Sequence, residues 1–244
     1  MKIREQIVEI GKRLYNKNLI SGYEGNISVR EGEKIYITPS GLCKGFLSVD
    51  DIIVIDREGN LLEGEKKPSS ETKMHLKIYN TRSDIKGIVH AHPPVATGFA
   101  CAGLGLEQSL TAETVLMFGT IPLAPYGTPS TDKLPEALTD YIEYNAILLA
   151  NHGAVTFAEN VEKAYFLMEQ VEHYAKITLV ANILGNPKTL PCEEVDRLME
   201  LRKKMGIETG LPKFCRVNED IKYYRFSREE LVNLIKGIIE ELGG

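Results

Sequence analysis

The sequence contains 244 residues, of which 43% are hydrophobic and 26% are charged, and its formal net charge is −5. These values fit one globular domain with an added terminal segment, and they argue against a largely disordered, collagen-like or disulfide-stapled chain. The acidic balance gives no general attraction to nucleic acid or to a membrane surface, so we expect neither as a partner. The charged N-terminus lacks the apolar run of an export signal, and no stretch approaches the roughly 18 apolar residues of a membrane span. We therefore expect a cytoplasmic protein.

The first part of the chain predicts one helix followed by three strands. Apolar residues recur at helical spacing over residues 3–19, with charges between them, as in an amphipathic helix. Short β-branched runs follow at residues 26–30, 34–38 and 52–55, separated by Gly, Pro and Asp. We expect these three runs to pair as antiparallel strands.

The middle of the chain predicts a helix, a buried strand and a second helix. The segment Pro-Ser-Ser-Glu at residues 68–71 is typical of a helix start, because serine oxygens satisfy free N–H groups and an acid complements the helix dipole. This helix should run to about Asn80. Residues 88–92 form an apolar run stopped by two prolines, which indicates a strand, and a helix through Phe99 should follow.

The second half of the chain continues this mixture. Strands are predicted at residues 121–124, 146–150 and 154–157, and helices at residues 134–144, 161–184, 193–205 and 228–241. Because strands and helices intermingle without strict alternation, we expect a layered α/β fold with a central mixed, largely antiparallel sheet flanked by helices. A break near residue 190 predicts a main domain at residues 1–190 and a helical C-terminal extension at residues 191–244.

Two of the five histidines indicate a metal site. His90 and His92 lie two apart in the predicted strand, so their imidazoles should share one face and lie close enough to bind one ion. A single buried strand histidine is usually a hydrogen-bonded core residue, but a pair would need two sets of polar partners. The four cysteines contain no C-x-x-C pair, so a thiolate site is not indicated.

Further ligands must come from elsewhere in the chain. His152, at a junction between two predicted strands, is a candidate third ligand, although it could equally be a turn histidine. Glu71 is a candidate fourth ligand, and the alternative is a solvated first-turn acid that matches the helix dipole. His75 lies one helical turn after Glu71 and is expected to pack against it or orient it. His173, in the long helix, is expected to be structural.

Three corners of small residues predict an anion pocket beside this site. They are Gly25-Asn26, Ser40-Gly41 and Ser69-Ser70, and each offers backbone N–H groups, hydroxyls or an amide without bulk. Any one of them alone is merely a turn. Their combination, with one corner directly before Glu71, suggests a phosphate placed next to a cation.

Six short motifs together resemble one known family. They are Gly25-Asn26-Ile27-Ser28-Val29-Arg30, Ile37-Thr38-Pro39-Ser40-Gly41, Pro68-Ser69-Ser70-Glu71, His90-Ala91-His92, Ala124-Pro125-Tyr126 and Asn151-His152-Gly153. In this order, across residues 5–185, the pattern resembles the class II aldolase/adducin family and, within it, the fuculose-phosphate aldolases.

The resemblance implies a metal-dependent lyase. It implies one Zn²⁺ per subunit held by His90, His92 and His152, with Glu71 as the fourth ligand and as the group that moves a proton. It places the substrate phosphate against Gly25, Asn26, Ser40, Gly41, Ser69 and Ser70. The expected reaction cleaves a ketose 1-phosphate, such as L-fuculose 1-phosphate, to dihydroxyacetone phosphate and an aldehyde such as L-lactaldehyde. A homotetramer with sites between subunits is expected as well.

Departures from the family pattern leave other functions open. Where fuculose-phosphate aldolases carry an assisting tyrosine from a neighbouring subunit, this chain has Glu113 near that place. Proteins that resemble ribulose-phosphate 4-epimerases carry Ser-Ser-Asp at the place where this chain has Ser70-Glu71. The longer side chain of glutamate fits the aldolase better. Phosphosugar dehydratases and decarboxylases of the family also use three histidines and stay open. An adducin-like head that binds no metal is the candidate from another class, and the intact histidines argue against it.

Overall fold

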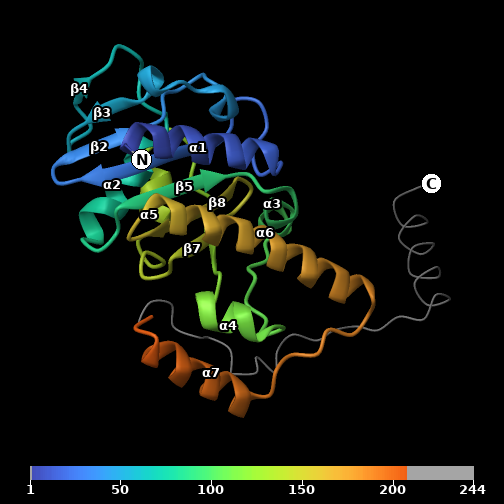
Figure 1. Ribbon diagram of the computed structural model, residues 1–244. Helices are drawn as coiled ribbons and strands as arrows, with labels where there is room; N and C mark the ends of the chain where they lie inside the picture. The colour runs from blue at the N-terminus through green and yellow to red at the C-terminus, as the bar shows by residue number, and fades with distance from the viewer. Residues whose placement is uncertain (1, 208–244) are drawn as a thin grey trace, which may run out of the picture.

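The computed structural model of the protein describes residues 2–207 and shows a central sheet with helices around it (Figure 1). The helices are α1 (Ile3–Asn16), α2 (Thr72–Thr81), α3 (Pro94–Cys101), α4 (Ala112–Phe118), α5 (Lys133–Ala137), α6 (Val161–Ile183) and α7 (Cys192–Lys204), with short 3-10 turns η1 (Lys44–Phe46) and η2 (Val49–Asp51). The strands are β1 (Asn26–Glu31), β2 (Lys34–Ile37), β3 (Ile53–Ile55), β4 (Leu61–Glu63), β5 (Gly87–Ala91), β6 (Leu123–Ala124), β7 (Ala146–Leu149) and β8 (Gly153–Ala158).

The strands of the described residues form one sheet in the order β4-β3-β2-β1-β5-β8-β7-β6. Neighbours pair antiparallel throughout except β6 and β7, which are parallel. The predicted mixed, largely antiparallel sheet is therefore confirmed, as is the antiparallel pairing of the three early strands. β5 lies between β1 and β8, and all five of its residues are buried. A strand buried on both faces explains why every residue of β5 except His90 is apolar or glycine.

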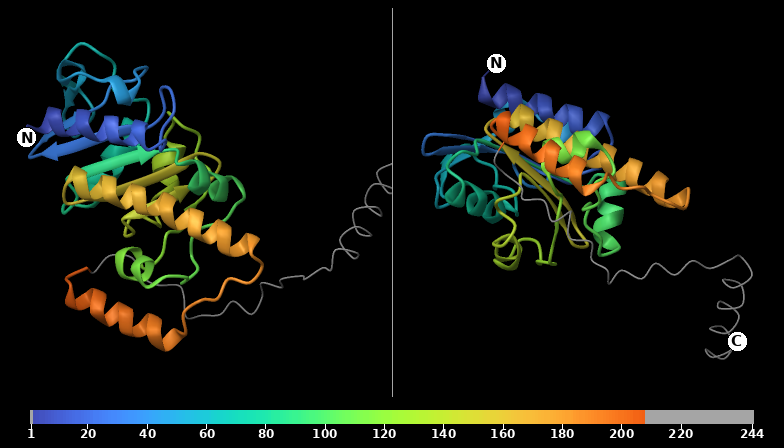
Figure 2. Two further views of the ribbon diagram at one scale, coloured as in Figure 1. Left: turned by 45° about the vertical axis from the view of Figure 1, so that its right-hand side comes forward. Right: turned by 90° about the horizontal axis from the view of Figure 1, so that it is seen from below.

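Helices lie on both faces of the sheet (Figure 2), and an apolar core lies on each face. One core joins α1, α3 and α6 to the sheet, and Val89 of β5 belongs to it. The other core joins α2 and α5 to the opposite face, and Ile88 belongs to it. Because side chains alternate along a strand, His90 and His92 share the face of Ile88, on the side of α2.

The register brings distant segments to one end of the sheet. Asn26, the first residue of β1, pairs with His90 near the end of β5. Ala91 pairs with Ala154 near the start of β8. The start of β1, the end of β5 and the turn before β8 therefore meet at the same end, and α2 begins beside them.

Several predicted boundaries needed correction. The helix expected at residues 134–144 is limited to α5 at Lys133–Ala137, after which the chain forms turns. β4 and α4 were not predicted; β4 is exposed at every position and so carries no alternating pattern. α7 agrees with the helix expected at residues 193–205 and packs against α4. The helix expected at residues 228–241 lies outside the described residues. Within residues 2–207, no helix has the length and apolar character needed to cross a membrane.

Candidate metal centre and active site

Three imidazole rings converge at the end of the sheet where β1, β5 and β8 meet. His90 is the residue before the last in β5, His92 directly follows the strand, and His152 belongs to the turn between β7 and β8. Their ring centroids lie 4.8–5.0 Å apart in all three pairs. The Nε2 atoms of His90 and His92 are 3.1 Å apart. Within residues 2–207, these three residues form a group that could hold a metal ion.

The local sequence explains how the turn delivers His152. Asn151 adopts a positive φ of 54°, a conformation that asparagine tolerates better than most residues. The next residue, Gly153, has no room for a side chain, because a Cβ there would lie 2.6 Å from both the carbonyl oxygen of Ala91 and the ring of His92. The motif Asn-His-Gly thus combines a tight turn, a ligand and a close approach of two strands.

Glu71 bridges two of the rings. Its Oε2 lies 3.0 Å from His90 Nε2 and its Oε1 lies 2.9 Å from His152 Nε2. Glu71 occupies the position before α2 and is only 7% exposed, so the interpretation as a solvated first-turn acid is wrong. Burial alone would raise the pKa of Glu71, but the facing rings outweigh it and hold the pKa below its usual range. The carboxylate is therefore ionised and aimed at the imidazoles.

The arrangement of donor atoms fits a divalent cation. His90 Nδ1 donates to the carbonyl oxygen of Ala154 at 2.9 Å, so in the neutral ring Nε2 carries a lone pair. That lone pair faces Nε2 of His92, and burial together with the other two rings lowers the pKa of His92 to about 3. A separation of 3.1 Å is close to the distance of about 3.3 Å between two nitrogens that bind one tetrahedral Zn²⁺. Imidazoles bind a metal ion in their neutral form, and three of them with one carboxylate are a donor set that suits zinc.

Two of the three small-residue corners are joined to each other. The backbone N–H of Ser40 donates to the carbonyl of Lys67 at 3.0 Å, and Pro39 forms a bridge with Pro68. The Ser69 hydroxyl oxygen accepts from the backbone N–H of Glu71 at 3.3 Å. These contacts bring Ser40-Gly41 and Ser69-Ser70 beside the start of α2, where Ser40, Gly41 and Ser70 are exposed.

The third corner lies against the metal centre itself. Gly25 has a φ of +71°, and a Cβ there would lie 2.7 Å from the carbonyl oxygen of His90. Asn26 is buried, and its Nδ2 donates to Glu71 Oε2 at 2.8 Å. From the sequence, Asn26 was predicted only as a phosphate ligand, and its contact with the carboxylate was missed.

Lys44 is a buried cation that the sequence did not reveal. It begins η1, is 3% exposed, and its Nζ donates to the backbone carbonyl of Tyr23 at 2.7 Å. Burial lowers its pKa, while the negative field of Glu71 acts in the opposite direction. A lysine in a short loop normally indicates a solvated side chain, so the sequence offered no signal for this position.

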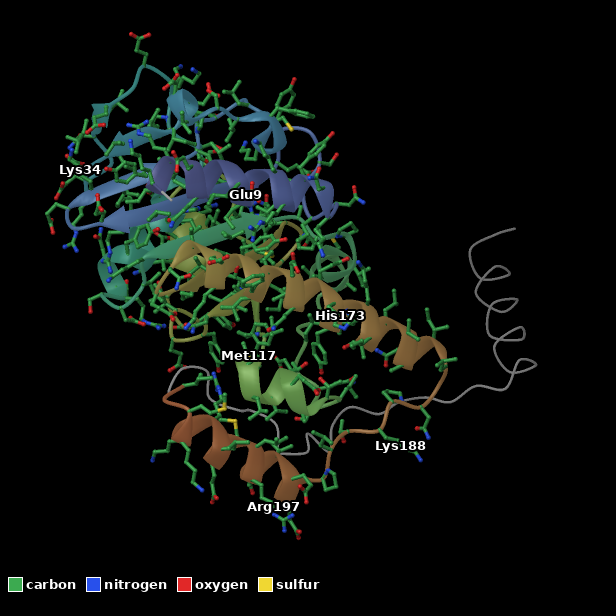
Figure 3. The ribbon with its side chains drawn as sticks, in the orientation of Figure 1. Glu9, Lys34, Met117, His173, Lys188 and Arg197 are labelled. Atoms are coloured by element: carbon green, nitrogen blue, oxygen red, sulfur yellow. The ribbon has the colours of Figure 1, made fainter. Side chains whose placement is uncertain are left out.

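Two other predicted residues lie away from the histidines. Glu113 is exposed in the first turn of α4, which packs mainly against α7. His173 is exposed on α6 (Figure 3). A groove lined by Met117 of α4 and His173 of α6, among others, includes none of the predicted site residues. The chemistry of the side chains, rather than the size of the groove, therefore identifies the site.

The fold and this site define a class of metal-dependent proteins. A model of the Class II Aldolase and Adducin N-terminal domain matches residues 5–179 of the chain. The chain therefore belongs to the class II aldolase/adducin family, as the six sequence motifs predicted.

Individual relatives support this assignment. The chain is 38% identical to a 5-deoxy-D-ribulose 1-phosphate aldolase from Bacillus thuringiensis serovar kurstaki, over 81% of this chain and 93% of that protein. It is 34% identical to a 3-oxo-tetronate 4-phosphate decarboxylase from Haemophilus influenzae, over 71% of this chain and 85% of that protein. A solved structure of an L-fuculose 1-phosphate aldolase matches with a TM-score of 0.77 and 37% identity, over 82% of this chain and 96% of that one. The prediction of a class II aldolase-type lyase is confirmed at the level of the family.

Proposed function

We propose that the chain is a zinc-dependent aldolase that reversibly cleaves a ketose 1-phosphate to dihydroxyacetone phosphate and an aldehyde. The observation that carries the proposal is the carboxylate of Glu71, buried against His90 and His152 beside the lone pair that faces His92. One Zn²⁺ per subunit would be held by these four residues. The bound ion would supply a Lewis acid for the carbonyl oxygen of the substrate.

Glu71 moves the proton in this proposal. Cleavage of the C3–C4 bond leaves negative charge on the three-carbon fragment, and its carbon must take a proton. In condensation the Glu71 carboxylate removes a proton from that carbon and becomes the carboxylic acid. In cleavage the carboxylic acid form of Glu71 gives the proton to the carbon, and the C4 hydroxyl loses its own proton as the aldehyde forms. Its long side chain can reach the substrate carbon, which favours an aldolase over an epimerase with the shorter aspartate at this place.

The small-residue corners bind the phosphate in this proposal. The residues involved are Gly25, Asn26, Ser40, Gly41, Ser69 and Ser70. Two of the corners are joined through Ser40 and Lys67, and the corner at Ser69 lies directly before Glu71. A phosphate held there would orient the reacting carbon toward the carboxylate, so binding energy from a non-reacting group is used for positioning.

The aldehyde side of the site is completed by a neighbouring subunit in this proposal. The enzyme is a cytoplasmic homotetramer with a catalytic domain at residues 1–190 and an extension at residues 191–244. Glu113 is exposed on α4, away from the histidines of its own chain, and would act as acid or base in the next subunit. Mixing inactive Glu71→Gln and Glu113→Gln chains should restore part of the activity, because some sites then receive both intact residues. Mixtures that stay inactive contradict this arrangement.

The substrate test uses ketose 1-phosphates of five and six carbons, including L-fuculose 1-phosphate and the 5-deoxy and methylthio pentulose 1-phosphates. Released dihydroxyacetone phosphate is measured by coupling to a glycerol-phosphate dehydrogenase. We expect release from at least one of these compounds, and none with His92→Ala protein. No release from any of them, with carbon dioxide formed from a 3-oxo acid phosphate, would favour a decarboxylase like the relative from Haemophilus influenzae. Epimerisation without cleavage would favour a ribulose-phosphate 4-epimerase, and loss of water without cleavage would favour a phosphosugar dehydratase.

A further inference from the structure

A line of polar side chains lies between α2 and β1, beside the apolar core on that face of the sheet. Asn26 and Ser28 belong to β1, and His75 and Tyr79 belong to α2. All four are buried, with exposed fractions between 0% and 3%. Ser28, His75 and Tyr79 have no part in the function proposed above, although burying three polar side chains in an apolar core is costly unless every group is hydrogen-bonded.

The spacing of the two elements explains how these side chains interleave. Four residues of a helix advance about 6 Å along its axis, and two residues of a strand advance about 6.5 Å. Glu71, His75 and Tyr79 therefore keep step with Asn26 and Ser28. Asn26 contacts both Glu71 and His75, and Ser28 contacts both His75 and Tyr79.

Hydrogen bonds connect each group to the next. The Tyr79 hydroxyl lies 2.8 Å from Ser28 Oγ, and Ser28 Oγ lies 2.6 Å from His75 Nδ1. His75 Nε2 lies 2.5 Å from Asn26 Oδ1. Asn26 Nδ2 lies 2.8 Å from Glu71 Oε2, so the line ends without a gap on the carboxylate of the metal centre.

The chemistry of the groups fixes the direction of every proton. A carboxylate only accepts, so the amide of Asn26 must turn its nitrogen toward Glu71 and its oxygen toward His75. That oxygen also only accepts, which places the proton of the neutral His75 ring on Nε2 and leaves Nδ1 to accept from Ser28. The Ser28 oxygen in turn accepts from Tyr79. All four hydrogen bonds therefore point the same way, toward Glu71.

We propose that His75 is a positioning residue for Glu71, acting through Asn26, with its tautomer held by Ser28 and Tyr79. Rotating the carboxylate away would leave the buried Asn26 nitrogen without its acceptor, so the line holds one oxygen of Glu71 in place. The kinetic part of this inference rests on the proposed aldolase activity. Its geometric part does not.

The far end of the line is anchored by Arg30. This residue follows Ser28 by two on β1, so it shares the same face. Its guanidinium lies 5.3 Å from the centroid of the Tyr79 ring and donates to the Tyr79 carbonyl oxygen at 2.9 Å. Because Arg30 fixes the Tyr79 side chain, the Tyr79 hydroxyl has one orientation. One orientation is needed if the line is to select one tautomer of His75.

The experiment compares two substitutions of His75. Leucine fills the site but removes both hydrogen bonds, whereas glutamine keeps an N–H donor and an acceptor at the end of the side chain. We expect His75→Leu to lower kcat about 10- to 100-fold with little change in KM, the range for groups that orient residues of a metal site. We expect His75→Gln to recover most of that loss.

Thr156→Val is the matched control. The Thr156 hydroxyl is buried in the same sheet and donates to the Ala164 carbonyl at 2.7 Å, without contact with the line. This variant should lose stability and keep its kcat. If His75→Leu keeps its kcat as Thr156→Val does, or if glutamine rescues nothing, His75 is only structural and the inference is overturned.

A measurement without substrate separates this inference from the proposed function. Cobalt-loaded proteins are compared by visible absorption, which reports the arrangement of the ligands. We expect changed bands in His75→Leu and unchanged bands in Thr156→Val, even if no ketose phosphate is cleaved. Unchanged bands in His75→Leu overturn the inference. If His75→Leu fails to fold, Tyr79→Phe takes its place, because it removes only one hydroxyl at the far end of the line. Tyr79→Phe should change the absorption bands in the same direction. Unchanged bands in Tyr79→Phe also overturn the inference.

Discussion

At Glu71, burial and charge act against each other within one side chain. Taking a carboxylate out of water disfavours its ionised form, yet His90 and His152 face its two oxygens and hold its pKa low. Asn26 adds a hydrogen bond to the same carboxylate. A carboxylate whose pKa is held this low is a weak base while it faces the rings, so it can take a proton from substrate only after it has left them.

The substitution Glu71→Gln tests that role. Glutamine keeps the size of the side chain and a hydrogen-bond acceptor for Asn26 but cannot take a proton. We expect kcat for the best ketose 1-phosphate to fall about 10²- to 10⁴-fold, the usual contribution of a general acid or base. KM should change far less. Steady-state kinetics with measured zinc content check this, and equal losses of affinity and rate would assign Glu71 to binding instead.

At this scale the sequence predicted which candidate ligands lie close together better than it predicted their surroundings. His90 and His92 could be placed on one face because a strand alternates with a period of two. The line from Tyr79 to Asn26 could not, because its members touch only once α2 has packed against β1. Lys44 was missed for the same reason, since its burial depends on the loop at Tyr23 rather than on its own neighbours in sequence.

The pairing of β5 with β8 depends on Gly153. A Cβ there would lie 2.6 Å from the Ala91 carbonyl oxygen and from the ring of His92. We expect Gly153→Ala to lower the free energy of unfolding by about 1–3 kcal/mol, as overpacking does in a close-packed core. Because the displaced neighbour includes His92, zinc affinity should fall as well. Chemical denaturation and zinc titration measure the two effects.

Gly98→Ala is the control for that substitution. Gly98 lies inside α3, and a Cβ there meets nothing within 4 Å. Alanine in a helix interior is about 0.5–1 kcal/mol more favourable than glycine, so this variant should be slightly more stable and bind zinc normally. If both alanine variants behave alike, the close approach at Gly153 is not what shapes the site.

The junction between α4 and α7 predicts how the chain tolerates shortening. α7 buries Val195 against its neighbours, and the backbone N–H of Leu190 donates to the Ser109 carbonyl just before α4. A chain ending at residue 190 loses this packing and should be less stable by about 1.5–3 kcal/mol, the value of burying one such side chain. A chain ending at residue 207 keeps it. Equal stability of the two chains would show that α7 adds nothing.

At the scale of elements, patterned segments were predictable and unpatterned ones were not. The long helix α6 was expected close to where it lies because its apolar residues recur at helical spacing, and the buried strands β5 and β7 because they are short apolar runs bounded by turn residues. α4 was missed although Thr111 caps it by accepting from the Thr114 N–H.

For the whole molecule, the four candidate ligands link segments that are far apart in sequence. Glu71 precedes α2, His90 and His92 lie on either side of the last residue of β5, and His152 lies before β8. An unfolded chain does not hold these groups together, so an ion that binds them binds only the folded state. Folding and metal binding are then coupled by mass action.

This coupling gives a prediction that needs no substrate. At a free Zn²⁺ concentration 100 times the dissociation constant, binding adds about 2.7 kcal/mol to the free energy of unfolding. For a chain of this size each kcal/mol raises Tm by about 2–4 °C, so Tm should rise by about 5–10 °C over that of the chelator-treated protein. His92→Ala removes one ligand and should remove most of the shift. An adducin-like head that binds no metal would show the same Tm with zinc as with chelator, in both proteins.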